Sequence, residues 1–510
     1  MLQCGRGVLM VKRAGGALLL SVEIDRDSAR PVSTQLYMAL RDLILSGAFA
    51  AGDRLPASRT LARDLALSRT TVIDAFERLI AEGLIESRVG SGTFVSDVLS
   101  ADRPKPLPGV SAIGVESRRR PLACAMNLAV EHFGERQRLP YRPRAFTTAL
   151  PDFDMFPMAQ WAQLSAKHWR GNRSEVMGYG EPCGHLPLRR AIASHLRANR
   201  GIGCEPEQIF IVAGAQQAFH LIGSVLLNPG DKAWFENPGA IGARNGFVAC
   251  GADLVPVPVD DEGLCVEKGL AQAADFRLAF VTPSHQQPLG SVMSLARRFA
   301  LLRAAEDAGA WIVEDDYDGE FFFGGQPLPT LKSVDTTGLV LYVGTFSKSL
   351  FPSLRLGYLL APPALVDIFE KIMGAFLHGV PSYLQAVVAE FIDEGHFATH
   401  LRRMRRVYAE RHEALREAAR AKLGGTLDLV PARSGLHTVG HLAAHLSELE
   451  VARIADKRGV IVSPIARFAV APISVSGLVL GFGSVGVPQI KAGIDVLAGA
   501  MESLSRRKAL

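Results

Sequence analysis

The stretch GTFSKSLFPSLRLGY, residues 344–358, places a lysine among groups that suit the binding of a phosphate. It continues the apolar, β-prone run LVLYVG, residues 339–344, which predicts a buried strand. Thr345 and Ser347 offer hydroxyl groups, and Arg355 carries a guanidinium that can bind a phosphate through two hydrogen bonds. We therefore expect Lys348 to lie beside a phosphate site at the end of a strand.

This strand is one of a series in which β-prone runs alternate with helical patterns. The runs past residue 146 include QIFIV (208–212), KAWFE (232–236), LAFVTP (278–283) and AWIVEDD (310–316). Helical patterns such as AQQAFHLIGSVLL (215–227) separate them. Such alternation predicts a mainly parallel sheet with helices on both faces, in which ligands bind beyond the C-terminal ends of the strands.

A second motif, AGAQQAF (213–219), follows the first of these strands. It places Gly214, Ala215 and Gln216 at a helix N-terminus, where free N–H groups and the helix dipole favour a phosphate. By itself, a glycine between a strand and a helix is a weak signal.

A third motif, VEDDYDGEF (313–321), ends another strand with several acidic residues. A carboxylate facing a pyridine nitrogen keeps that nitrogen protonated, and a tyrosine hydroxyl can bond a phenolic oxygen. Asp315 and Tyr317 are the predicted residues, and Asp316 is the second choice for the carboxylate. Taken alone, the motif equally suits a metal-binding or a solvated acidic turn.

The first hundred residues have a different pattern. STQLYMALRDLILSG (33–47) predicts a helix that ends at Gly47. Two more helices are predicted for SRTLARDLA (58–66), with Ser58 as N-cap, and RTTVIDAFERLIAEG (69–83), with Ser68 as N-cap and Gly83 as stop. LIESRVGSGTFVS (84–96) then predicts a β-hairpin. Together these elements predict a winged helix-turn-helix.

A winged helix-turn-helix predicts contacts with double-stranded DNA. The recognition helix presents its N-terminal residues to the major groove, while wing glycines allow close approach of the backbone. The predicted DNA-binding residues are Arg59, Ser68, Arg69, Thr70, Thr71, Gly90 and Gly92. Residues 31–96 hold seven basic against seven acidic residues, so composition alone does not suggest DNA. The alternative is a small helical module that binds another protein, in which Arg59 and Arg69 are only solvated charges.

We call this winged helix-turn-helix, residues 31–96, the reader. It resembles the GntR family of bacterial regulators over LPASRTLARDLALSRTTVIDAFERLIAEGLIESRVGSGTFV (55–95). The Lys348 stretch resembles the cofactor segment of fold-type I aminotransferases, and YGEPCGHLPLRRAIASHL, which begins at Tyr179, resembles the segment that reaches the phosphate of a neighbouring subunit. Over nearly its whole length the chain is thus similar to the MocR subfamily of GntR-type regulators.

This resemblance implies bound pyridoxal 5′-phosphate, with Lys348 forming the Schiff base. The predicted cofactor-binding residues are Gly214, Ala215, Gln216, Asp315, Tyr317, Thr345, Ser347, Lys348, Arg355 and Tyr179. The resemblance also implies a head-to-tail homodimer in which each reader packs on the partner's large domain. Binding of a small molecule or of the cofactor would then alter how the readers lie on DNA.

The sequence departs from the family pattern where an amino-acid ligand would be held. Ala240 replaces the aromatic residue after ENPG, Gln287 replaces another aromatic, and Leu289 replaces a small hydroxyl residue. Val479 stands where aminotransferases have an arginine that binds the substrate carboxylate. Arg467 or Arg433 could substitute for that arginine, although no motif supports either. Covalent cofactor binding is expected to survive, whereas transamination is doubtful.

Length and composition agree with several domains. The 510 residues exceed one core, and 48% hydrophobic with 21% charged residues is ordinary globular usage. The six cysteines form no CxxC pair, so we expect neither a zinc site nor a disulfide framework. No run is apolar and long enough to span a membrane, and GGALLLSV near the start lacks a signal cleavage site, so a cytoplasmic protein is predicted.

The predicted organisation is an N-terminal extension and arm (1–30), the winged helix-turn-helix (31–96), a linker (97–145) and an effector domain (146–510). The linker is rich in proline and contains Arg118, Arg119 and Arg120, which could touch DNA or only keep the tether solvated. The fold class is α/β: a reader joined to a fold-type I aminotransferase-like domain with a mainly parallel sheet and a smaller C-terminal α+β subdomain.

The predicted function is a DNA-binding transcriptional regulator whose aminotransferase-like domain holds pyridoxal 5′-phosphate and senses an amino compound or the cofactor itself. One alternative is an active aminotransferase with an attached DNA-binding domain, which the intact Lys348 permits and which Ala240 and Val479 oppose. Another is a DNA-binding protein whose large domain has lost its cofactor and serves only for dimerisation.

Overall fold

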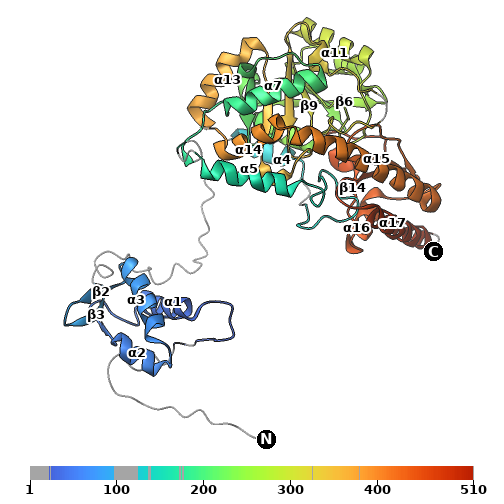
Figure 1. Ribbon diagram of the computed structural model, residues 1–510. Coiled ribbons are helices and arrows are strands. Elements are labelled where there is room, and N and C mark those ends of the chain that lie inside the picture. Colours follow the sequence, from blue (N-terminus) through green and yellow to red (C-terminus); the bar gives the residue numbers. More distant parts are fainter. Residues whose placement is uncertain are drawn as a thin grey trace. The chain divides into compact units, whose positions relative to one another are not determined.

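The computed structural model describes residues 22, 24–96, 124–135, 139–171, 174, 177–323, 326–377 and 379–508. The chain divides into two compact units, Met1–Arg120 and Pro121–Leu510 (Figure 1). The arginine run at 118–120 lies outside the described residues, as do most of residues 1–30. No helix in the described part of the chain is long and apolar enough to cross a membrane.

The smaller unit contains the predicted winged helix-turn-helix. Its helices are α1 (Val32–Leu45), α2 (Ser58–Asp64) and α3 (Arg69–Ala81). Strands β1 (Arg54–Leu55), β2 (Ile85–Arg88) and β3 (Gly92–Val95) form an antiparallel sheet in the order β1-β3-β2. Apolar residues at helical spacing in α1 and α3 meet in one core, including Leu36, Leu40, Val72 and Leu79.

Local signals set the ends of these helices. Ser68 is the N-cap of α3, as predicted, because its hydroxyl accepts a hydrogen bond from the Thr71 N–H at 3.1 Å. Gly47 and Gly83 have φ of +81° and +70°, which suits glycine after a helix. The prediction of Ser58 as N-cap was wrong: α2 begins at Ser58, and Ala57 takes the cap position without a side-chain hydrogen bond.

The larger unit is built on an eight-stranded sheet in the order β4-β11-β10-β9-β8-β5-β6-β7. Strands β6, β5, β8, β9 and β10 are parallel to their neighbours in that series, while β11 and β7 pair antiparallel. The strands are β4 (Ile209–Val212), β5 (Lys232–Asn237), β6 (Asp253–Asp260), β7 (Gly263–Leu264), β8 (Leu278–Val281), β9 (Trp311–Asp316), β10 (Val340–Thr345) and β11 (Gly357–Leu360). The mainly parallel sheet is therefore confirmed.

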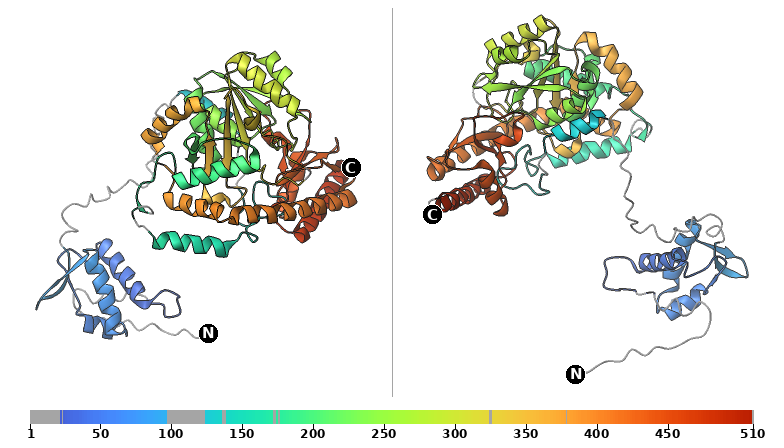
Figure 2. Two further views of the ribbon diagram at one scale, coloured as in Figure 1. Left: turned by 45° about the horizontal axis from the view of Figure 1, so that its top comes forward. Right: turned by 180° about the vertical axis from the view of Figure 1, so that it is seen from behind.

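Successive residues of the central strands enter different cores, so both faces of the sheet are covered. In β9, Val313 belongs to one apolar cluster and Ile312 to another; in β8, Phe280 and Ala279 divide in the same way. The helices around the sheet include α8 (Ala215–Leu226), α9 (Ile241–Ala249), α10 (Val266–Gln272), α11 (Leu295–Ala308), α12 (Leu331–Val334) and α13 (Val366–Ile372) (Figure 2).

The C-terminal subdomain has its own antiparallel sheet in the order β12-β13-β15-β14. These strands are β12 (Leu427–Leu429), β13 (His437–Leu442), β14 (Ser463–Pro464) and β15 (Gly477–Gly481), with helices α15 (His396–Leu423), α16 (Glu448–Lys457) and α17 (Val487–Lys508). Helices α5 (Met158–Arg170), α7 (Leu186–Arg200) and α14 (Ser382–Asp393) complete the unit. Helix α4 (Cys124–His132) lies within the predicted linker range and packs on α9.

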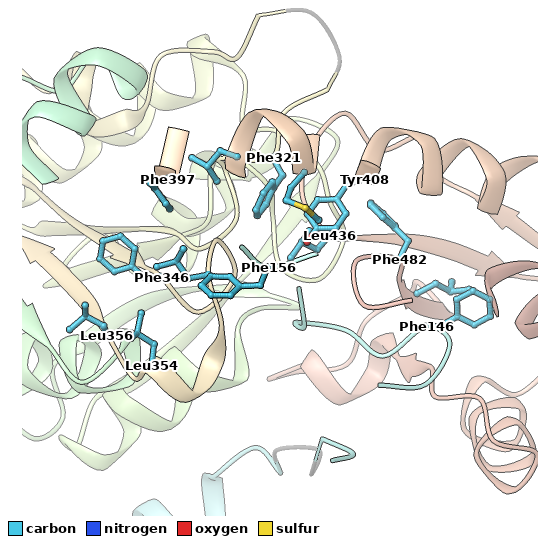
Figure 3. Close-up of a cluster of buried hydrophobic side chains, with 14 of the residues drawn as sticks. Phe146, Phe156, Phe321, Phe346, Leu354, Leu356, Phe397, Tyr408, Leu436 and Phe482 are labelled. Carbon is cyan, nitrogen blue, oxygen red and sulfur yellow. The ribbon is translucent and has the colours of Figure 1, made fainter. Parts of the chain in front are cut away.

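The turn that carries Lys348 is held by buried aromatic and aliphatic side chains. Phe346 and Leu350, two residues to either side of the lysine, are both buried. The Phe346 ring lies 5.9 Å from the rings of Tyr358 and Phe397, within the cluster drawn in Figure 3. These contacts fix the lysine at the C-terminal end of β10.

Candidate functional site

A cavity of about 320 Å³ lies at the C-terminal ends of the parallel strands. Its wall includes nine of the ten predicted cofactor-binding residues: Gly214, Ala215, Gln216, Asp315, Tyr317, Thr345, Ser347, Lys348 and Arg355. Residues from three separate motifs thus meet at one site. The tenth, Tyr179, does not line this cavity and is 98% exposed.

The amine of Lys348 is positioned by a segment far away in sequence. Its Nζ donates a hydrogen bond to the Ala149 carbonyl at 2.8 Å. Ala149 has φ of +66°, a left-handed conformation that is uncommon for a residue with a side chain. The Thr148–Ala149 backbone therefore forms part of the cavity wall. No sequence motif pointed to this segment.

Of the two candidate carboxylates, Asp315 lines the cavity, whereas Asp316 is engaged elsewhere. Asp315 is 5% exposed, and its Oδ1 has no hydrogen-bond partner among the described residues. Burial raises the pKa of Asp315 well above its usual range; Asp316 and Asp318 add to this, and Lys348 opposes it. A buried carboxylate oxygen without a partner is costly, so it marks a place where a donor would bind favourably.

Tyr317 is linked to a buried histidine and aspartate. His285 Nδ1 lies 3.1 Å from the Tyr317 hydroxyl oxygen and 3.0 Å from Asp318 Oδ2. Burial and the nearby Asp318 raise the pKa of Tyr317 well above its usual range, so the phenol keeps its proton. His285, Asp318 and His437 are near enough to be considered as metal ligands, but the His285–Asp318 hydrogen bond already accounts for two of them.

The opposite end of the cavity is lined by groups that can donate hydrogen bonds to an anion. Gly214, the N-cap of α8, has φ of +84°, so α8 begins at the cavity and the positive end of its dipole lies there. Arg355 donates from Nη2 to the Ala213 carbonyl at 3.0 Å, which holds its guanidinium beside Gly214. The Ser347 N–H donates to Thr345 Oγ1 at 3.2 Å. This end is cationic and rich in N–H and O–H groups.

Three of the four residues that depart from the family pattern lie around the same lysine, whereas Leu289 lines a separate cavity. Ala240, Gln287 and Arg467 line the large cavity, and Val479 lines a smaller one that also contains Lys348. Arg433, the other candidate for binding a carboxylate, lines a separate cavity. His437, which was not among the predicted site residues, lines the smaller cavity. A lone histidine within a β-prone run gives no sequence signal.

A buried network of ion pairs and hydrogen bonds includes Asp316, the residue that follows Asp315. Arg200 pairs with Asp316, which also accepts from the Tyr342 hydroxyl. Glu320 accepts from His195 Nε2 at 2.6 Å and pairs with Arg405. Burial acts to raise the pKa of Glu320, but His195, Arg200 and Arg405 outweigh it and lower the pKa to about 2.

Glu320→Gln is expected to lower stability at neutral pH by about 3 kcal/mol. Because the folded pKa of about 2 lies below the usual 4.5, the stabilisation is complete above pH 4.5 and is lost as pH falls toward 2. Between pH 4.5 and pH 2, the free energy of unfolding of the variant should therefore fall less steeply than that of the wild type. Urea denaturation followed by tryptophan fluorescence measures this, since all four tryptophans lie in the larger unit. Glu306→Gln, an exposed site on α11, should match the wild type.

In the smaller unit, the predicted DNA-binding residues lie at the start of α3, in α2 and at the tip of the wing. Arg59, Arg69 and Thr70 are exposed, and Ser68 Oγ lies 2.7 Å from the hydroxyls of both Thr70 and Thr71. Gly90 and Gly92 lie at the tip of the β2–β3 hairpin with positive φ. A side-chain carbon on Gly92 would meet Arg54 Nε at 2.8 Å, so Arg54 lies against the wing. Arg54 was not among the predicted DNA-binding residues.

The larger cavity fits pyridoxal 5′-phosphate. The orphaned Asp315 oxygen suits a protonated ring nitrogen, the Tyr317 hydroxyl suits a phenolic oxygen, and the Arg355 end suits a phosphate. Lys348 is the primary amine of that wall among the residues described. A cavity of about 320 Å³ falls within the range of small-ligand sites.

Two family descriptions match the chain. "Aminotransferase class I and II" matches residues 148–478, and "Bacterial regulatory proteins, gntR family" matches residues 32–95. A Rhizobium meliloti protein named "Probable rhizopine catabolism regulatory protein MocR" is 39% identical over 96% of this chain and 97% of its own length. The "HTH-type pyridoxine biosynthesis transcriptional regulator PdxR" of Corynebacterium glutamicum is 30% identical over 91% of this chain and 95% of its own.

Solved structures resemble the larger unit. The α-aminoadipate aminotransferase LysN from Thermus thermophilus, crystallised with N-(5′-phosphopyridoxyl)-L-leucine, superposes with a TM-score of 0.66 at 26% identity. The match covers 75% of this chain and 96% of that one. The larger unit therefore has the fold of aminotransferases that use pyridoxal 5′-phosphate.

Proposed function

Because this chain belongs to the MocR subfamily of GntR-type transcriptional regulators, we propose that its aminotransferase-like domain binds pyridoxal 5′-phosphate and controls how its reader binds DNA. The signal is an amino compound or the cofactor itself. The observation that carries this proposal is the meeting of nine predicted residues around one cavity in a chain that also has an exposed recognition helix. A regulator of this kind would act in the cytoplasm, where it meets DNA.

The cofactor would be held at both ends. Lys348 would supply the amine for its aldehyde, Asp315 would face the ring nitrogen, and Tyr317 would donate to the phenolic oxygen. Arg355, with the α8 N-terminus and the hydroxyls of Thr345 and Ser347, would bind the phosphate. When bound, the cofactor supplies a reactive aldehyde and an electron-withdrawing ring.

Asp315→Asn is expected to weaken cofactor binding roughly tenfold to a hundredfold, because a hydrogen bond to a charged group contributes about 1.5–3 kcal/mol. Asparagine has nearly the same shape but carries no charge to hold the ring nitrogen's proton. Equilibrium dialysis with absorbance detection measures the affinity. Asp307→Asn, at an exposed position on α11, should bind the cofactor as the wild type does. Equal affinities of the two variants for the cofactor would show that Asp315 does not bind it.

The reader would bind double-stranded operator DNA through the start of α3 and the wing. Arg69, Thr70 and Thr71 would contact bases and phosphates in the major groove, with Ser68 ordering the two threonines. Arg59, Gly90 and Gly92 would lie against the DNA backbone.

A head-to-tail homodimer would complete the cofactor site. Tyr179 is exposed in the single chain, and in a dimer its hydroxyl would reach the phosphate bound by the partner. Sedimentation at the concentrations used for DNA binding tests this, and a monomer would exclude it.

The rival function, catalytic transamination, is disfavoured by the apolar Val479 beside Lys348. A substrate carboxylate held without an arginine loses the positioning that proton transfer needs. The test incubates the cofactor-loaded protein with a panel of amino acids and measures keto acid. The proposal expects less than one keto acid per chain over the assay. Repeated turnover would make the protein an enzyme.

A further inference from the structure

In the smaller cavity beside Lys348, the wall at Val479 is apolar where the family pattern has an arginine for a carboxylate. Val479 in β15 is 1% exposed and lies opposite Val439 and Ser463 on the neighbouring strands. It packs in one apolar cluster with Val439, Ile465 and Phe468. A carboxylate against this wall would lose its water without gaining a cation.

Gln287 presents an uncharged amide at this point. It is half-buried and lines both cavities that contain Lys348. Its backbone is fixed, since its N–H donates to Thr282 Oγ1 at 3.0 Å and its carbonyl accepts from Gln286 Nε2 at 2.9 Å. Within the described part of the chain, its side-chain amide has no hydrogen-bond partner. One donor group and one acceptor are therefore offered to a ligand.

His437 adds a neutral acceptor to the smaller cavity. Its Nε2–H donates to the Pro288 carbonyl at 3.1 Å, which leaves Nδ1 without its own proton. Burial, with His285 and Lys348 nearby, lowers the pKa of His437 to about 3, so the ring carries no charge at neutral pH. An imidazole in this state accepts a hydrogen bond from a hydroxyl and does not attract a carboxylate.

We propose that the compound that reaches Lys348 is a hydroxylated amine without a carboxylate. Its amino group would enter at Lys348, and its hydroxyls would be bound by the Gln287 amide and the His437 imidazole. The inference rests on the proposed function, because it takes the site as loaded with pyridoxal 5′-phosphate. Arg467 is the cation that could favour a carboxylate instead; it lines the larger cavity and donates to the Glu135 carbonyl at 3.0 Å.

Serinol and L-serine form a matched test pair, because a second hydroxymethyl group in serinol replaces the carboxylate of serine. Each is titrated into the cofactor-loaded, full-length protein, and the change in cofactor absorbance is followed. Serinol is expected to half-saturate at a concentration about tenfold lower than serine, since one well-formed buried hydrogen bond is worth about that factor. Equal or tighter binding of serine would overturn the proposal, as would no response to either compound.

Gln287→Leu should raise the half-saturating concentration of serinol about tenfold and leave the cofactor band in place. Gln272→Leu, at an exposed position that ends α10, is the control and should match the wild type. Unchanged serinol binding in Gln287→Leu would overturn the role of the amide. If Arg467→Gln abolished the binding of serine, Arg467 would be the group that binds a carboxylate in this site, and the inference would be refuted.

The cofactor band separates failure of this inference from failure of the proposed function. A protein that shows no band after incubation with pyridoxal 5′-phosphate contradicts both. A protein that shows the band and prefers serine contradicts only the hydroxylated-amine ligand.

Discussion

Lys348→Ala is expected to abolish covalent attachment of pyridoxal 5′-phosphate. The amine of Lys348 lies in the wall of the 320 Å³ cavity, which Arg355, the proposed phosphate ligand, also lines. Without the amine, the aldehyde has no partner there, although the phosphate site remains. The visible absorbance band should shift to that of the free aldehyde, and no lysine adduct should survive borohydride reduction.

Peptide mass spectrometry after reduction gives the site of attachment directly. In the wild type the adduct should lie on the peptide that contains Lys348. Lys268→Ala, at an exposed position on α10, should retain the full adduct. An adduct of wild-type yield in Lys348→Ala would show that another lysine holds the cofactor.

Arg69→Ala is expected to weaken binding to operator DNA roughly tenfold to a hundredfold, as the removal of one arginine from a DNA interface typically does. Arg69 is the first residue of α3 and is exposed beside Thr70. Ser68 caps the helix independently of Arg69, so the fold of the reader should be unchanged.

The salt dependence of binding separates the two ways in which Arg69 could act. If Arg69 binds a phosphate, its removal lowers the slope of log affinity against log salt by about 0.9, whereas removal of a base-reading arginine relaxes specificity at one position. Fluorescence anisotropy with the DNA upstream of the protein's own coding sequence supplies both readings. Arg303→Ala, at an exposed position on α11, should bind DNA normally. An Arg69→Ala variant with unchanged affinity would place the DNA interface elsewhere.

Much of the site could be predicted because its residues follow strands of one parallel sheet. Ligands bind beyond the C-terminal ends of such strands, so Asp315 and Lys348 were expected at one edge of the sheet, and the structure places β9 next to β10. Continuous apolar runs likewise indicated the strands, since neighbours such as Ile312 and Val313 enter cores on opposite faces of the sheet. In the reader, Ser68 could be predicted as a cap because serine directly precedes a periodic helix.

The remainder comes from contacts between distant segments without a local pattern. Ala149 and Lys348 are 199 residues apart, and nothing in the sequence around Ala149 marks its carbonyl as the lysine's partner. His437 reaches the site because the start of β13 lies beside Pro288, whose carbonyl accepts its hydrogen bond, 149 residues away in sequence. The choice between Arg467 and Arg433 also depended on which cavity each lines. The prediction of Ser58 as an N-cap was wrong because Ser58 is already the first helical residue of α2 and Ala57 takes the cap position.

The central claim is that the aminotransferase-like domain controls the DNA-binding domain. The direct test measures affinity for the protein's own upstream DNA with the cofactor-free protein, the cofactor-loaded protein, and the loaded protein saturated with serinol. We expect affinity to change at least about fivefold between two of these states, the lower range of allosteric coupling, and Lys348→Ala to remove the response to the amine. Equal affinity in all three states, with absorbance showing that cofactor and amine are bound, would contradict the account.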